Sequence, residues 1–186
     1  MNPANVLLLP GWHNSDPAHW QSRWEATHGY VRVQQHDWDR PLRGDWLMQL
    51  EAAVLDTVGD VILVAHSLGC IQLAAWAAHS QHTQRIKAAL LVAPADVERD
   101  AVRALLPSWS PIARQTLPFK SVLVASGNDP FCTWAQSQTL ARDWGAELVN
   151  GGNIGHINAA AGLGDWPQGH VLLLGLQEQE LLTSPS

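Results

Sequence analysis

The sequence contains little charge and no concentration of positive charge. Lys, Arg, Asp and Glu make up 15% of its 186 residues, with 17 acidic against 11 basic side chains and a formal net charge of −6. No cluster of Lys or Arg occurs, which argues against nucleic acid or an anionic membrane surface as the main partner. The low charged fraction, beside 46% hydrophobic residues, excludes an extended disordered chain.

Long hydrophobic runs are also missing. No stretch approaches the ~20 apolar residues that a transmembrane helix needs. Residues 1–9 hold neither a charged n-region nor a long apolar core, so we expect no signal peptide and no membrane partner. The sequence shows no internal repeat and no linker. At 186 residues the chain is long enough for a substantial core, and we expect a single domain over residues 1–186.

Cysteine is scarce, and no metal-binding pattern is evident. The two cysteines, Cys70 and Cys132, are far apart and form neither a redox nor a metal-ligand spacing. We therefore expect reduced thiols in a cytoplasmic protein. His79 and His82 lie close together, but no third ligand is near them. We expect neither a metal site nor a cofactor.

Six apolar runs alternate with segments of helical character. The runs predict strands at 5–9, 30–36, 60–65, 86–93, 119–125 and 147–149. The predicted helices are 17–28, 44–58, 68–79, 97–106, 131–144 and 170–182. The middle strands are apolar on both faces, which is typical of a parallel sheet covered by helices on both sides. We predict an α/β fold with a six-stranded parallel sheet, whose ligands bind beyond the carboxyl ends of the strands.

One apolar run ends abruptly at a serine. The residues Ala65-His66-Ser67-Leu68-Gly69 follow this run and open an Ala-rich segment of helical character. A serine at such a tight turn has its hydroxyl pushed outward, beside free N–H groups at a helix N-terminus. The pattern matches the G-x-S-x-G nucleophile elbow of α/β-hydrolases, except that Ala65 replaces the first glycine. The alternative is an ordinary strand-to-helix turn in which Ser67 caps the helix.

A nucleophilic serine needs a base to take its proton and a carboxylate to orient that base, in the chain order Ser, acid, His. Asp129 follows the fifth expected strand, in a Ser-Gly-Asn-Asp-Pro turn over residues 126–130, and is the first candidate for the acid. Its alternative role is to cap the next helix. Asp96, with Asp100 nearby, follows the fourth expected strand, but Asp96 is better suited to capping the helix after it.

Only His156 and His170 follow Asp129 in the sequence. His156 lies in a glycine-rich loop beyond the last expected strand, and such a loop lets the imidazole reach both Ser67 and Asp129. His170 begins the terminal helix and is suited to packing. His66 adjoins the serine but points away from it in a sharp turn. We therefore predict that His156 is the base.

The oxyanion that forms on the substrate needs two N–H donors. We predict the backbone N–H of Leu68, directly after the serine, and the backbone N–H of Trp12, in the loop after the first strand. Gly11 permits the conformation that turns the Trp12 amide inward. The alternative for Pro10-Gly11 is a plain turn.

Short motifs are distributed from about residue 6 to residue 176. They are Leu9-Pro10-Gly11, His19-Trp20, 65–69, 125–130, 141–145, 155–158 and Trp166-Pro167. Together they resemble the retinoblastoma-binding-protein-9-like small serine hydrolases of the α/β-hydrolase superfamily. The resemblance implies an α/β-hydrolase fold without a large lid, and a catalytic triad at Ser67, Asp129 and His156. It leaves the substrate open, and no short linear motif here indicates protein binding.

The segment 94–118, where larger hydrolases insert a cap, is too short for a cap domain. We therefore expect an open site, overhung by Trp109. Aromatic residues near the predicted triad indicate an apolar pocket for small acyl or aromatic groups. The residues predicted to line or flank it are Gly11, Trp12, His13, Trp109, Phe131 and Trp134. Only Arg114 adds a basic side chain near the expected mouth, so recognition of anionic substrates has little support.

These residues predict a serine hydrolase that cleaves a small carboxylic ester, thioester or amide through an acyl-Ser67 intermediate. Two alternatives remain open. One is a protein-interaction module that retains a vestigial triad. The other is related chemistry on the same fold, either acyl transfer or aminopeptidase-like amide cleavage. The sequence does not indicate an oligomeric state.

Overall fold

A wholly parallel sheet forms the centre of the protein. The computed structural model describes residues 2–178. The six strands are β1 (Val6–Leu9), β2 (Val31–Arg32), β3 (Val61–His66), β4 (Ile86–Val92), β5 (Lys120–Ala125) and β6 (Glu147–Asn150). Their spatial order is β2-β1-β3-β4-β5-β6. The strand order reverses between β1 and β3, which is where sheets of this type bind ligands.

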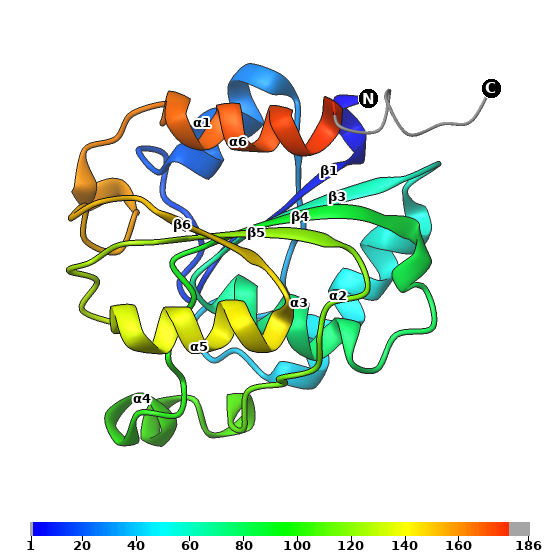
Figure 1. Ribbon diagram of the computed structural model, residues 1–186. Helices are drawn as coiled ribbons and strands as arrows, with labels where there is room; N and C mark the ends of the chain where they lie inside the picture. Colours follow the sequence, from blue (N-terminus) through cyan, green and yellow to red (C-terminus); the bar gives the residue numbers. More distant parts are fainter. Residues whose placement is uncertain (1, 179–186) are drawn as a thin grey trace.

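Helices cover both faces of the sheet. One face carries α1 (Trp20–His28) and α6 (Pro167–Glu178), and the other carries α2 (Arg43–Asp56), α3 (Leu68–Ala77) and α5 (Trp134–Trp144) (Figure 1). The segment between β4 and β5 holds only α4 (Asp100–Leu105) and a 3-10 turn at Pro107–Trp109. The predicted sheet, the helices on both faces and the lack of a large cap are confirmed. No helix within residues 2–178 is long and apolar enough to cross a membrane.

The alternation of side chains along the central strands divides the core into two layers. In β3, Ile62 and Val64 pack with residues of α1 and α6, whereas Leu63 and Ala65 pack with residues of α2 and α3. Every residue of β3 is buried. A strand that is buried on both faces explains the uninterrupted apolar run in the sequence.

Two helices begin later than the ranges 17–28 and 131–144 predict. In each case a side chain in the preceding loop caps the first turn. His19 accepts a hydrogen bond from the Gln21 N–H at the start of α1. Thr133 caps α5 in the same way. Both caps are local side-chain contacts that fix where the helical hydrogen bonds start.

Other boundaries of helices and strands differ from the predicted ranges because a local turn or the edge of the sheet decides them. α4 begins later than the expected 97–106, and Asp96 does not cap it, because the Asp96 carboxylate accepts the Glu98 N–H in a turn of its own. The strand expected at 30–36 shortens to β2, an edge strand that pairs with no strand of residues 2–178 other than the short β1. The last helix begins before the expected range 170–182, and the predicted end of that range lies outside the described residues.

Candidate active site

Ser67 occupies the sharp turn between β3 and α3. Its φ and ψ are 55° and −119°, a positive-φ conformation that is strained for any residue other than glycine. The Ser67 N–H donates to the Val92 carbonyl oxygen at 3.0 Å and holds the turn. Ser67 stands at the N-cap position of α3, but its hydroxyl makes no capping hydrogen bond. The alternative of a helix-capping serine is therefore wrong.

Two glycines allow the chain to pass close to this turn. A Cβ on Gly69 would lie 2.2 Å from the Leu9 carbonyl oxygen, and a Cβ on Gly11 would lie 2.8 Å from Ser67 Cβ. Real Cβ atoms do not approach so closely, so a side chain at either position would force its surroundings to shift. The glycines bring the end of β1 against α3 and beside the serine.

Ser67, His156 and Asp129 form one chain of hydrogen bonds. Ser67 Oγ lies 2.8 Å from His156 Nε2. His156 Nδ1 lies 3.0 and 2.9 Å from the two carboxylate oxygens of Asp129. The side chains of His156 and Asp129 are 9% and 3% exposed, so they are largely shielded from water. When the hydroxyl donates to Nε2 and Nδ1–H donates to the carboxylate, the imidazole is oriented to take the serine proton.

The other candidate acids and bases have different partners. Asp96 accepts a backbone N–H in its own turn, and Asp100 pairs with Arg103. His170 Nε2 lies 2.8 Å from the Tyr30 hydroxyl. Among the described residues, none of these three side chains makes a hydrogen bond to the serine or to the base.

His66 supports the loop of His156 and stays uncharged. Its Nε2–H donates to the His156 carbonyl oxygen at 2.9 Å, so its hydrogen bond is to the loop and not to the serine. Burial, with smaller contributions from His19 and His156, lowers the pKa of His66 well below its usual value. Burial also lowers the pKa of His19 to about 4. Both histidines are therefore neutral at pH 7 and add no positive charge to the site.

A polar network that the sequence did not predict joins the loops of Asp129 and His156. Asn128 Oδ1 accepts hydrogen bonds from the Ser126 hydroxyl at 2.9 Å and from the Gly155 N–H at 2.8 Å. Ser126 precedes Asp129 in the segment after β5, and Gly155 directly precedes His156 in the segment after β6. Together with the hydrogen bond from the Ile154 N–H to the Ser126 hydroxyl, at 3.0 Å, this amide holds the two loops beside each other.

The predicted oxyanion donors, Trp12 and Leu68, both line the cavity at Ser67. Within residues 2–178, neither backbone N–H has a protein acceptor. The indole N–H of Trp12 donates to the Asp39 carbonyl oxygen at 2.9 Å, and the Trp12 and His13 rings stack with their centroids 4.4 Å apart. These contacts hold the loop after β1 in shape and leave both backbone amides available to a ligand.

A cavity of about 420 Å³ opens at the serine. Of the residues predicted to line or flank the pocket, it contains Gly11, Trp12, His13 and Phe131. Its lining also includes side chains that the sequence did not indicate as pocket residues, among them Asn14, Asp16, His19, Val102, Leu105 and Asn158. No Lys or Arg among the described residues belongs to the lining.

Two predicted tryptophans lie outside this cavity. Trp109 is fully buried, its indole N–H donates to the Pro41 carbonyl oxygen at 2.9 Å, and its ring packs on Trp46. The prediction that Trp109 overhangs the site is therefore wrong, because its indole is buried in the core beneath α2. Trp134 packs against the same core cluster. Arg114 pairs with two carboxylates and is not part of the lining.

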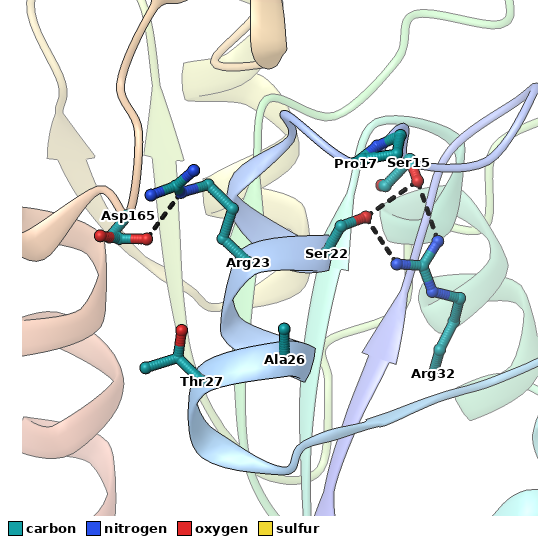
Figure 2. A pocket seen from close by; sticks show the side chains of 8 residues that line it. All are labelled: Ser15, Pro17, Ser22, Arg23, Ala26, Thr27, Arg32 and Asp165. Carbon is teal, nitrogen blue, oxygen red and sulfur yellow. Dashed lines mark hydrogen bonds and ion pairs between the residues drawn. The ribbon is translucent and has the colours of Figure 1, made fainter.

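A second hollow, of about 580 Å³, lies beside α1 (Figure 2). Its two arginines are both engaged. Arg23 pairs with Asp165 at 2.6 Å, and Arg32 donates to the Ser22 hydroxyl at 2.6 Å and to the Ser15 carbonyl oxygen at 3.0 Å. The lining of this hollow contains neither a histidine nor a cysteine, so it offers no base beside a hydroxyl.

The sequence matches a family model described as serine hydrolase over residues 6–175. Among solved structures, the chain is similar to a YdeN-like hydrolase from Pectobacterium atrosepticum. The two are 31% identical with a TM-score of 0.83, over 94% of this chain and 90% of that chain. No curated protein matches the sequence.

More distant structures share the fold. The ydeN gene product from B. subtilis is 19% identical, with a TM-score of 0.69 over 92% of this chain and 97% of that chain. Est1E from Butyrivibrio proteoclasticus is 13% identical, with a TM-score of 0.66 over 96% of this chain and 90% of that chain. These likenesses confirm the predicted α/β-hydrolase fold.

Proposed function

Because the chain belongs to the serine hydrolase family, we propose that it hydrolyses a small carboxylic ester, thioester or amide through an acyl intermediate on Ser67. One observation carries the proposal. Ser67 Oγ lies 2.8 Å from His156 Nε2, and the other ring nitrogen of that histidine meets Asp129. Within the family, the sequence motifs resemble those of the retinoblastoma-binding-protein-9-like small serine hydrolases.

Acylation begins when Ser67 Oγ attacks the substrate carbonyl carbon and its proton passes to His156 Nε2. Asp129 holds the imidazole in the accepting tautomer and stabilises the imidazolium that forms. The carbonyl oxygen gains negative charge and receives hydrogen bonds from the N–H groups of Trp12 and Leu68. The bond to the leaving group then breaks, and His156 gives that group its proton.

Deacylation repeats these steps with water as the nucleophile. His156 takes a proton from the water, and the oxygen attacks the acyl carbon. The bond to Ser67 Oγ breaks, the serine recovers its proton from His156, and the carboxylic acid leaves. An alcohol or amine in place of water would give acyl transfer by the same steps. Product analysis with methanol added to the assay therefore measures how the intermediate divides between hydrolysis and transfer.

The charges around the cavity favour neutral substrates. Asp16 and Asp96 line it, and no Lys or Arg of the described residues does. A second negative charge brought beside these carboxylates would be repelled, and no cation is present to recognise it. A cavity of about 420 Å³ also limits the size of the group that can be enclosed. We expect small uncharged esters to be cleaved faster than monoesters of dicarboxylic acids, which keep one charged carboxylate.

Labelling by a fluorophosphonate tests whether the serine is a nucleophile. We expect an adduct on Ser67 in the folded protein and none in Ser67→Ala. Hydrolysis of p-nitrophenyl acetate should fall by ~10⁴-fold or more in Ser67→Ala and in His156→Ala, because each change removes one member of the triad. An unlabelled serine in the folded wild type would contradict the proposal and would favour a non-catalytic interaction module.

Asp129 and Asp96 lie in the same region, so one substitution at each gives a matched test of which carboxylate acts as the acid. Asp129→Asn should lower kcat by ~10⁴-fold, because the amide no longer favours the accepting tautomer of the base. Asp96→Asn removes a charge from the same cavity, and we expect a far smaller change. A larger loss in Asp96→Asn than in Asp129→Asn would reassign the acid to Asp96.

A further inference from the structure

Apolar side chains are exposed at the cavity beside the serine. Leu105 is 66% exposed and Phe131 is 48% exposed. Both line this cavity together with the partly buried Val102. A hollow in which large apolar side chains remain exposed to solvent is typical of a binding site, because these side chains lose contact with water only when a ligand covers them.

The three side chains belong to one wall. Val102 and Leu105 stand at positions i and i+3 of α4, so they project from the same side of the helix. Phe131 continues this wall toward the proposed base, because its ring centroid lies 4.6 Å from that of His156. The wall therefore extends from the imidazole to α4.

Two hydrogen bonds tie the segment of α4 to the loop of Phe131. Arg99 Nη1 donates to the Pro130 carbonyl oxygen at 2.7 Å. The Asp96 N–H donates to the Phe131 carbonyl oxygen at 3.2 Å. The two parts of the wall are thus held together without a ligand, and a bound chain would not have to order them.

Another part of the lining is polar. Asn14, Asp16 and His19 come from the segment between β1 and α1, and Asn158 comes from the segment after β6. The chain that enters α1 lies on the face of the sheet covered by α1 and α6, whereas α4 lies beyond α5 on the other face (Figure 1). Polar side chains therefore gather on the α1 side of the cavity, whereas the large apolar side chains lie beside α4, where Asp96 adds one carboxylate to the lining.

We propose that Val102, Leu105 and Phe131 form a subsite that receives an unbranched hydrocarbon chain of the substrate. This inference rests on the proposed function, because the chain must be attached to the carbonyl group that Ser67 attacks. The chain belongs either to the acyl group or to the alcohol of the ester. Both present the same hydrocarbon to the wall, and the experiment distinguishes them.

Two ester series test the subsite. The first is p-nitrophenyl acetate, butyrate, hexanoate and octanoate, and the second is the alkyl acetates from methyl to hexyl. Full burial of one methylene is worth about a fourfold change in kcat/KM, and on a partly open wall we expect about twofold. Hexanoate has four methylenes more than acetate, so kcat/KM should rise roughly 16-fold from acetate to hexanoate. In Leu105→Ser this hexanoate-to-acetate ratio should fall by about threefold or more. A fall in this hexanoate-to-acetate ratio places the acyl group in the subsite. A fall in the hexyl-to-methyl ratio of the alkyl acetates places the alcohol there instead.

Val171→Ser is the matched control. Val171 is 65% exposed on α6 and is not part of the lining, so the variant loses a similarly exposed apolar side chain elsewhere. Its chain-length ratios should equal those of the wild type. If circular dichroism shows Leu105→Ser to be unfolded, Val102→Ser takes its place and is judged by the same chain-length ratios.

The proposal is overturned if Leu105→Ser keeps the wild-type ratios in both series, or if its rates fall equally at every chain length. A wild type without any dependence on chain length overturns it as well. These results differ from a failure of the proposed function itself. In that case the fluorophosphonate would not label Ser67, and p-nitrophenyl acetate would not be hydrolysed.

Discussion

Replacing Gly69 by alanine should reduce both stability and catalysis. Alanine in a helix is normally better than glycine by about 1 kcal/mol. Here the new methyl group would lie 2.2 Å from the Leu9 carbonyl oxygen and 2.9 Å from the Pro10 carbonyl oxygen. Both are backbone atoms that cannot rotate away, so α3 and the end of β1 must separate by about 1 Å to restore normal contact. Overpacking of this kind lowers the free energy of unfolding by about 1–3 kcal/mol.

The same displacement acts on the two N–H groups that we propose as oxyanion donors. Trp12 follows β1, and Leu68 is the first residue of α3. Moving these elements apart changes the distance between the two amides. Loss of one such donor lowers kcat by ~10²–10³-fold, so we expect a loss of ~10-fold or more in Gly69→Ala. KM should change little, because these hydrogen bonds form mainly in the transition state.

Gly175→Ala is the matched control. Gly175 lies inside α6, and a Cβ added there meets no atom of the described residues within 4 Å. This substitution should raise the free energy of unfolding by about 0.5–1 kcal/mol and leave kcat unchanged. Urea denaturation with linear extrapolation measures the stability, and hydrolysis of p-nitrophenyl acetate measures the rate. If Gly69→Ala were as stable and as active as the wild type, the close approach of α3 to β1 would be refuted.

Three further predictions concern buried groups. The pKa of His19 is about 4 and that of His66 is also lowered, both by burial. Below pH ~6.5 the unfolded chain therefore binds more protons than the folded protein does. Urea denaturation should show that His19 alone lowers the free energy of unfolding by about 2–3 kcal/mol between pH 7.5 and pH 4.5. His19→Asn should remove this loss. Burial raises the pKa of the Cys132 thiol to about 11 and that of Cys70 further still, so a disulfide reagent at pH 8 should modify neither thiol until the protein is denatured. Arg32→Gln should lower both stability and kcat/KM, because the largely buried guanidinium holds the start of α1 and the loop after β1 (Figure 2); unchanged kinetics would show that the loop is held by other contacts.

The centre of the sheet and the position of Ser67 at its edge were predictable because their signals are local. The expected strands 60–65 and 119–125 correspond closely to β3 and β5. Both are apolar runs that end at small or polar residues, as buried parallel strands do. Once those ends are fixed, Ser67 and Asp129 must lie at the same edge of the sheet. The chain order Ser, acid, His then leaves few histidines as candidates for the base.

The lining of the cavity was less predictable, because long-range packing decides it. Trp109 lies in the expected segment, but its indole reaches the Pro41 carbonyl oxygen and the Trp46 ring, both far away in the sequence. The exposure of Leu105 depends on where α4 ends and on what covers it. Helical periodicity over such a short helix carries too little information to indicate which face meets a cavity.

The hydrogen bonds that join the loops of Asp129 and His156 were partly predictable. Ser126 and Asn128 are small polar residues directly after an expected strand, which is a usable signal for a structured turn. Their partner, the Gly155 N–H, belongs to a different loop. A sequence without pairing information cannot connect the two loops, so the network becomes evident only when β5 and β6 are paired.

The replacement of the first glycine of the elbow pattern by Ala65 has a physical explanation in these contacts. Ala65 lies within β3, fully buried and paired with Leu9 on one side and Leu91 on the other, and the core cluster accommodates its methyl group. The close backbone approach occurs instead at Gly69, where α3 meets the end of β1. The strained serine therefore depends on glycine on the helix side of the turn, whereas the strand side needs only a small residue that fits the core. A departure at Ala65 leaves the geometry of the turn intact, and a departure at Gly69 would not.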